Sequence, residues 1–160
     1  MKRGFNTDCD AVLPSKSQIA YIDMRAFAHA TEDVDKVLSA VRNTIPEELI
    51  GTVAFEKSNL TGHHGNPIIL LETRIKKPEA AQGVFQKLSS SLSILEKEQL
   101  NSEISQRLEK GNLYIRLDKQ YAYLNQIKLG QTDPIHLRIH FKKHHPQEVI
   151  EICRKFGLLP

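Results

Sequence analysis

Residues 134–145, PIHLRIHFKKHH, alternate between apolar and basic side chains. The apolar row consists of Ile135, Leu137, Ile139 and Phe141, and the basic row consists of His136, Arg138, His140, Lys142 and His144. A period of two predicts a strand with one buried face and one solvent-facing face. Because the basic row holds no acid, water, salt or a polyanion must screen it. We expect the apolar row to pack on helices and the basic row to face a phosphate backbone.

Four other stretches are predicted as strands, and helical patterns separate them. The predicted strands are residues 18–29, 51–57, 67–76 and 113–118, with a brief strand at 126–129. Helices are predicted after a cap at Thr31, from Pro78 to about residue 92, over 93–110 with a capping box, over 119–125, and over 146–156. In the first strand, the pattern does not show which of its two rows is buried.

Strands and helices interleave, and most of the strands alternate strictly. This combination favours an α+β fold with a mainly antiparallel sheet and helices packed on one face. At 160 residues, we expect a flexible leader at 1–17 and a single domain at 18–160. Cys9 and Cys153 lie in no metal-ligand spacing, which indicates free thiols in a reducing compartment. No apolar run reaches the ~18 residues needed to span a bilayer, so we expect a cytoplasmic protein.

The formal charge is only +3, so the case for a polyanion partner depends on where the charges lie. On one strand, alternate side chains are about 6.5 to 7 Å apart, close to the phosphate repeat of an extended nucleic acid. Cations of several strands would form one surface if the strands are neighbours: Arg74, Lys76, Arg116, Arg138, Lys142 and Lys143. The alternatives are an ordinary solvated face, or a basic face that docks an acidic protein partner.

A second candidate site is the pair His63 and His64 between Gly62 and Gly65. Flanking glycines let a backbone approach a ligand closely, so an anion or RNA contact, a metal site and a structural loop are all open interpretations. No nucleotide-binding, protease or hydrolase motif is present. Glu72 and Asp118 could join the histidines in a metal-dependent hydrolase, but salt bridges to neighbouring arginines explain these carboxylates more simply. We therefore predict no catalytic residue, metal or cofactor.

Four blocks resemble an archaeal family of small predicted RNA-binding proteins. The blocks are FAHATEDVDKV at 27–37, GHHGNPIILLETRIK at 62–76, GNLYIRLDKQYAYL at 111–124 and DPIHLRI at 133–139. Together they span most of residues 20–155, and the leader is an extra segment relative to the family. The resemblance implies RNA binding, a link to the exosome, and a fold similar to that of the ribosomal protein that binds 5S rRNA. It implies no catalytic residues.

The resemblance makes RNA, rather than DNA, the expected partner of the basic surface. Exosome or ribosomal proteins are further expected partners, and exposed edge strands allow a homodimer without requiring one. The residues expected to contact RNA are Arg25, His63, His64, Asn66, Arg74, Lys76, Arg116, Lys119, His136, Arg138, His140, Lys142 and Lys143.

Overall fold

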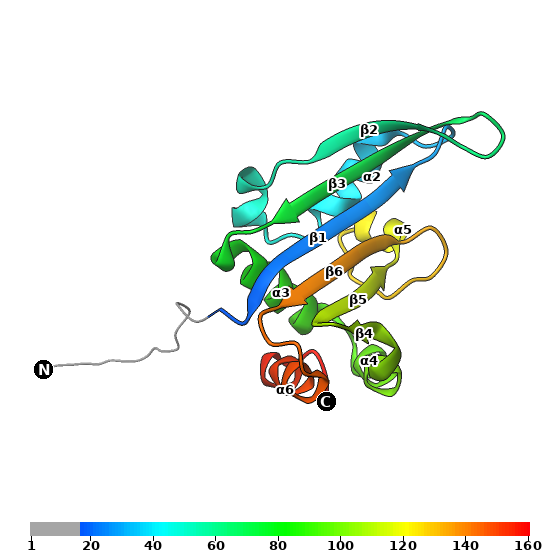
Figure 1. The fold of residues 1–160 in the computed structure, drawn as a ribbon. Coiled ribbons are helices and arrows are strands. Elements are labelled where there is room, and N and C mark those ends of the chain that lie inside the picture. Colours follow the sequence, from blue (N-terminus) through cyan, green and yellow to red (C-terminus); the bar gives the residue numbers. More distant parts are fainter. Residues whose placement is uncertain (1–16) are drawn as a thin grey trace, which may run out of the picture.

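A six-stranded antiparallel sheet forms the centre of the computed structural model, which describes residues 17–160 (Figure 1). The strands are β1 (Ile19–Ala28), β2 (Glu56–Thr61), β3 (Pro67–Ile75), β4 (Leu108–Glu109), β5 (Asn112–Leu117) and β6 (Ile135–Phe141). Their order across the sheet is β2-β3-β1-β6-β5-β4, so β1 and β6 lie at its centre. The α+β class and the antiparallel sheet predicted from the sequence are confirmed. All but the last residue of the predicted leader lies outside the described residues.

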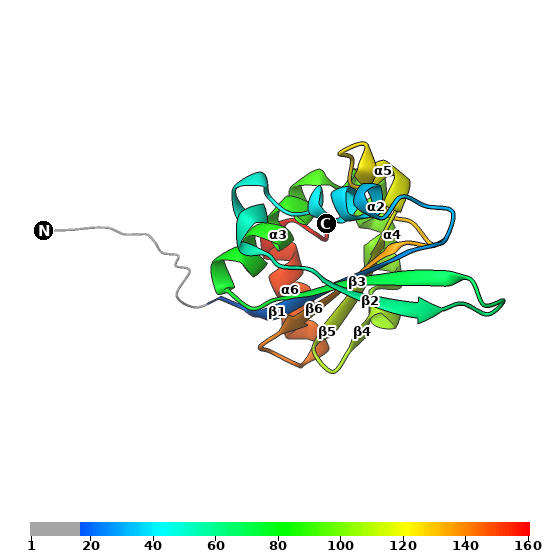
Figure 2. The same ribbon diagram turned by 90° about the horizontal axis from the view of Figure 1, so that it is seen from above.

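The helices gather on one side of the sheet, as the view from above shows (Figure 2). They are α2 (Val34–Arg42), the 3-10 helix η3 (Glu47–Thr52), α3 (Pro78–Ser91), α4 (Ile94–Arg107), α5 (Lys119–Tyr123) and α6 (Pro146–Phe156). Ser93 and Glu96 form the predicted capping box of α4. The predicted cap at Thr31 is wrong, because it is the side chain of Asp33 that accepts the Asp35 backbone N–H, at 2.9 Å. None of the described helices is long and apolar enough to cross a membrane.

The apolar row of β6 is buried, as its alternation predicts. Ile135, Leu137, Ile139 and Phe141 are each at most 2% exposed. In β1 the buried row is Ile22, Met24, Ala26 and Ala28, a choice that the sequence pattern had left open. These two central strands supply the sheet side of the core. Cys153 also lies in the core, where burial raises the pKa of its thiol to about 12.

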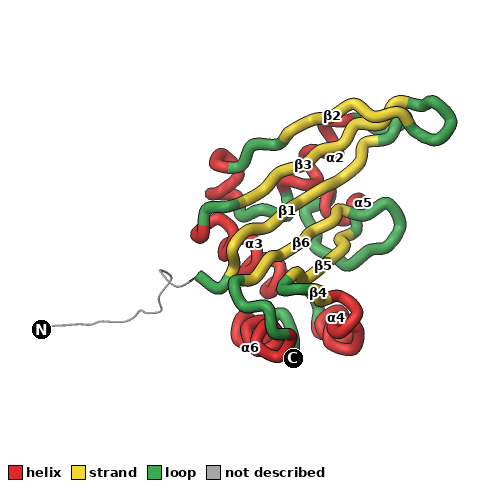
Figure 3. Tube along the Cα trace, in the orientation of Figure 1, coloured by secondary structure: helices red, strands yellow, loops and turns green. Residues whose placement is uncertain are grey.

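The largest difference from the predicted elements lies at β2. Residues 51–57 were predicted as a strand, but η3 occupies the first part of this stretch and β2 begins only at Glu56. The connection between the two strands is therefore shorter than the gap between the predicted strands 51–57 and 67–76, and a turn over 62–66 joins β2 to β3 (Figure 3). All six residues of β2 are exposed. Edge-strand pairing with β3, rather than apolar alternation, therefore determines where this strand lies.

Candidate nucleic-acid interface

The sheet face turned away from the helices, here called the open face, carries the polar rows of the strands. Directly opposite residues of paired strands share a face, so the strand register shows which side chains meet. Arg25 of β1 lies opposite His136 of β6, which in turn lies opposite Arg116 of β5. Within the next cross-strand row, Asp23 lies between Arg74 of β3 and Arg138 of β6. The register thus brings basic residues of four strands together.

A hollow of about 900 Å³ lies on the open face. Its basic lining residues are Arg25, Arg74, Lys76, Arg107, Arg116, His136 and Arg138, and its acidic ones are Asp23, Glu56 and Glu72. Arg107 comes from the end of α4, and its Nη1 donates to the carbonyl oxygen of Tyr114 at 3.4 Å. The hollow is mixed in charge with an excess of cations, an arrangement suited to an anionic ligand of nucleotide size or larger.

Asp23 holds two arginines at the centre of the open face. Arg74 donates through Nε at 2.7 Å and through Nη2 at 3.0 Å, and Arg138 donates through Nη2 to the second carboxylate oxygen at 2.5 Å. Burial raises the pKa of Asp23, but the hydrogen bonds and charges of the two guanidinium groups outweigh burial and lower it. Asp23 therefore stays charged at neutral pH and cancels part of the positive charge in this row.

The Arg25, His136 and Arg116 row differs because neither arginine forms an ion pair with any residue of 17–160. Both guanidinium groups are exposed. The pKa of His136 is lowered by partial burial and then by the charges of Arg25 and Arg116. At neutral pH the imidazole is thus mainly a neutral hydrogen-bonding group between two cations. We call these three residues the anion row.

His140 lies on the opposite side of the Asp23 row from the anion row. Its ring stacks on Tyr21 with centroids 4.8 Å apart, and its Nδ1 lies 2.7 Å from the Asn112 side-chain oxygen. Arg74 also covers Tyr21, with the guanidinium carbon 4.0 Å from the ring centroid. Partial burial, His144 and the neighbouring arginines lower the pKa of His140. His140 therefore adds little positive charge at pH 7, contrary to a simple reading of the basic row.

Of the other lysines expected to contact RNA, Lys76 lines the hollow. Lys142 and Lys143 do not line it, and they follow β6 in an exposed segment. The Lys143 ammonium is 3.8 Å from Glu148, and both side chains are more than half exposed, so this pair contributes little stability.

His63, His64 and Asn66 lie in the turn at the end of the β2–β3 hairpin, which extends beyond the rest of the sheet (Figure 1). All three are exposed, and the two imidazole rings meet edge to face with centroids 4.9 Å apart. None of them lines the hollow on the open face. The structure therefore separates the expected RNA contacts into the open face and a hairpin tip.

Lys119 departs from the expected set because its side chain is buried on the helical side, with 8% exposed. Its ammonium donates to the Phe27 carbonyl oxygen at 2.8 Å, to Glu32 at 3.0 Å and to Asp133 at 2.6 Å. Asp118 caps α5 immediately before it, which sets the direction of this side chain. Three acceptors occupy its three protons, so Lys119 ties the β1–α2 connection to the loop before β6 instead of facing the open side.

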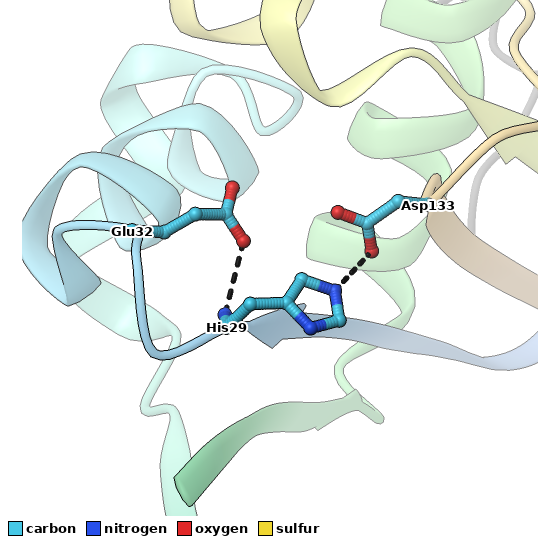
Figure 4. Close-up of side chains that lie close together, drawn as sticks. All are labelled: His29, Glu32 and Asp133. Carbon is cyan, nitrogen blue, oxygen red and sulfur yellow. Dashed lines mark hydrogen bonds and ion pairs between the residues drawn. The ribbon is translucent and has the colours of Figure 1, made fainter. Parts of the chain in front are cut away.

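Glu32 and Asp133, which this lysine contacts, lie close to His29, and the three residues place potential metal-ligand atoms within 4.8 Å of one another (Figure 4). The ammonium of Lys119 pairs with both carboxylates, however, so a cation of the protein already compensates part of their charge. The pKa of Asp133 is raised by burial but lowered overall by Lys119 and His29. We interpret the cluster as an ion-pair network.

The residues of the hydrolase alternative do not come together either. Glu72 lies on the open face, and Asp118 accepts the Tyr121 backbone N–H at 2.9 Å as the cap of α5. The histidines belong to the hairpin tip. The salt bridges expected for these carboxylates do not form within residues 17–160, since Arg74 pairs with Asp23 instead.

Sequence reasoning overlooked Asp23, Tyr114 and Arg107 as parts of this surface. Asp23 and Tyr114 occupy outward positions of alternating strands, which was the available signal, but only the strand order places them beside Arg138. Arg107 ends a helix, so no strand pattern could have pointed to it.

The molecule is thus an α+β protein whose antiparallel sheet is covered by helices on one face and presents a hollowed, charged surface on the other. The chain belongs to the RNA-binding family: the family model described as "RNA binding" matches residues 21–141. It is 37% identical over 133 residues to the RNA-binding protein PAB1135 of Pyrococcus abyssi, covering 81% of this chain and 86% of the relative.

Solved structures agree with this assignment. Protein AF2318 from Archaeglobus fulgidus, a DUF54 protein, is similar with a TM-score of 0.73 and 30% identity, covering 86% of this chain and 99% of that one. Mth689, a DUF54 protein from Methanothermobacter thermautotrophicus, has a TM-score of 0.71 and 30% identity, with coverage of 86% and 97%. The family and the α+β fold are therefore shown by sequence and by structure.

Proposed function

We propose that this protein is a non-catalytic RNA-binding protein that holds RNA phosphates against the open face of its sheet. The observation that carries the proposal is the convergence of cations from β1, β3, β5 and β6 on one hollow of the open face. Membership of the RNA-binding family supports RNA as the polyanion. A protein that neutralises phosphates gains affinity with little sequence preference.

The cations of the open face contribute unequally in this proposal. Arg25 and Arg116 are exposed and form no ion pair among the described residues, although Glu72 lies opposite Arg25 in the register, so they are the main phosphate contacts. Arg74 and Arg138 share the charge of Asp23, and they position the surface while adding a weaker attraction. Lys76, Lys142 and Lys143 extend the field around the hollow, and the hairpin tip with His63, His64 and Asn66 forms a second contact.

Fluorescence anisotropy with a labelled single-stranded RNA tests the proposal directly. We expect binding at about 50 mM salt, with log affinity falling linearly as log salt concentration rises. Labelled RNA recovered after prolonged incubation should be intact with and without added divalent metal. An absence of binding at about 50 mM salt would contradict RNA binding, and cleavage that scales with protein concentration would contradict the non-catalytic role.

The resemblance of the sequence to an exosome-linked family supports a finer proposal, in which the protein is an accessory subunit of RNA-processing or ribosome-associated machinery with a fold like that of the 5S-rRNA-binding ribosomal protein. Affinity purification before and after nuclease treatment tests this role. Exosome or ribosomal proteins that remain bound after nuclease treatment would support it. Their loss would leave RNA binding alone.

A further inference from the structure

Tyr114 presents an aromatic ring on the open face. It lies on β5 between the buried Leu113 and Ile115, and it is 37% exposed. Across the sheet it faces Arg138, and Arg116 follows it on the same side of the strand. Tyr114 also lines the hollow that the arginines surround. Solvent exposure of a sheet face accounts for its charged side chains. It does not account for an exposed aromatic ring among them.

The other rings of the open face are already occupied. Tyr21 is contacted by Arg74, 4.0 Å from the ring centroid, and stacks with His140. Phe27 is half-buried, and Arg25 lies 6.0 Å from its ring. Within residues 17–160, no ring or cation stacks on Tyr114. Its ring is therefore the aromatic group of the hollow that is available to a ligand.

The spacing of cations around this ring matches a nucleotide. Arg116 is two residues along β5 from Tyr114, which places the two side chains about 7 Å apart on one face. Beyond Arg116, the anion row continues across His136 to Arg25. A flat group stacked on Tyr114 would thus have a two-arginine anion site next to it. An RNA nucleotide has this form, with a planar base joined through ribose to a phosphate.

We propose that this part of the hollow binds one unpaired RNA nucleotide, with its base stacked on Tyr114 and its phosphate held by Arg25 and Arg116. This inference rests on the proposed RNA-binding function and names its preferred ligand as single-stranded RNA. Bases of a duplex are paired and stacked on each other, so they offer no face to the tyrosine. Base–aromatic stacking accepts any base, so the preference is for strandedness and not for sequence.

Binding of two labelled RNAs tests the inference: a ten-nucleotide uridine oligomer and a blunt-ended duplex of two fully complementary strands. Tyr114→Ala should weaken binding of the oligomer about tenfold, within the range for one stacked base. Tyr114→Phe keeps the ring and should bind within twofold of the unchanged protein. Tyr123→Ala, which removes an exposed tyrosine of α5 on the helical side, is the matched control and should have no effect.

Inorganic polyphosphate, which has charges but no bases, completes the experiment. Competition of polyphosphate against the labelled oligomer should give the same polyphosphate affinity for the unchanged protein and for Tyr114→Ala. Equal loss of oligomer, duplex and polyphosphate binding in Tyr114→Ala would overturn the stacking role, and so would no loss at all. If the unchanged protein binds neither RNA, the proposed function itself fails. Equal affinity of the unchanged protein for both RNAs would contradict the preference for an unpaired nucleotide but not RNA binding itself.

Discussion

Asp23 of β1 and Arg138 of β6 lie directly opposite each other on the two central strands, and their side chains form an ion pair of 2.5 Å on the open face. Arg74 of β3 pairs with the same carboxylate from the other side. One acid thus fixes two guanidinium groups, whereas Arg25 and Arg116 of the same surface form no ion pair within residues 17–160. This asymmetry underlies the first two predictions.

Asp23→Asn should lower the free energy of unfolding by about 1 kcal/mol at pH 7, because a partly exposed ion pair with two donors is lost. For a chain of this size the melting temperature should fall by about 2–4 °C. The pKa of Asp23 is lowered in the folded state, so its contribution is full above the unfolded pKa of about 3.9 and is lost as pH falls through the folded value. Thermal unfolding at several pH values should show that the melting temperatures of the unchanged protein and of Asp23→Asn become equal in acid. Glu72→Gln, on the same face but without an ion pair, is the control.

Removing both unpaired arginines should flatten the salt dependence of RNA binding. For single strands each phosphate contact contributes about 0.7 to the slope of log affinity against log salt, so Arg25→Gln with Arg116→Gln should reduce the slope by about 1.4. Anisotropy titrations over a series of salt concentrations measure it. Arg154→Gln with Lys155→Gln on α6 removes the same charge from another element. A similar change in both double variants would show that net charge alone matters.

RNA binding should raise the pKa of His136, because a phosphate favours the imidazolium that burial, Arg25 and Arg116 disfavour in the free protein. Affinity should therefore increase as pH falls through the interval between the bound and free pKa values. NMR titration of the imidazole signals, with and without RNA, measures the shift. Without RNA, Arg25→Gln should also raise this pKa, while His140 provides an internal comparison. An unchanged His136 pKa at saturating RNA would place the phosphate elsewhere.

Replacing Lys119 tests whether this residue is structural. Lys119→Met leaves two carboxylates and a carbonyl without their shared donor. Breaking a fully buried ion pair costs about 3–5 kcal/mol, and the cost here should be smaller because the two carboxylates are about a third exposed. We expect a large drop in melting temperature and, where the variant is still folded, unchanged RNA affinity. Lys36→Met on the exposed side of α2 is the matched control. Native stability combined with lost RNA binding would restore Lys119 as an RNA contact.

Much of the fold could be predicted because buried apolar residues recur along the chain with the period of the strand or helix that holds them. The alternation of residues 134–145 identified β6 and its buried row, and the apolar spacing and caps identified α3, α4 and α6. The edge strand β2 was misplaced because none of its residues is buried, so it leaves no apolar pattern. The cap of α2 was misplaced by two residues because Thr31 and Asp33 both have capping side chains.

The candidate site was predictable only in part, for a related reason. Alternation shows which side chains of a strand share a face, and this marked Arg74, Arg116 and Arg138 as outward residues but left open the side on which Arg25 lies. Alternation is a property of one strand, so it carries no information about which strands are neighbours or in what register. Pairing of residues 115 positions apart brought Asp23 to Arg138, and contacts with Phe27 and Glu32, 92 and 87 positions away, turned Lys119 inward. Local periodicity therefore determined the faces, while strand order and register decided which charges neutralise one another and which are left for a ligand.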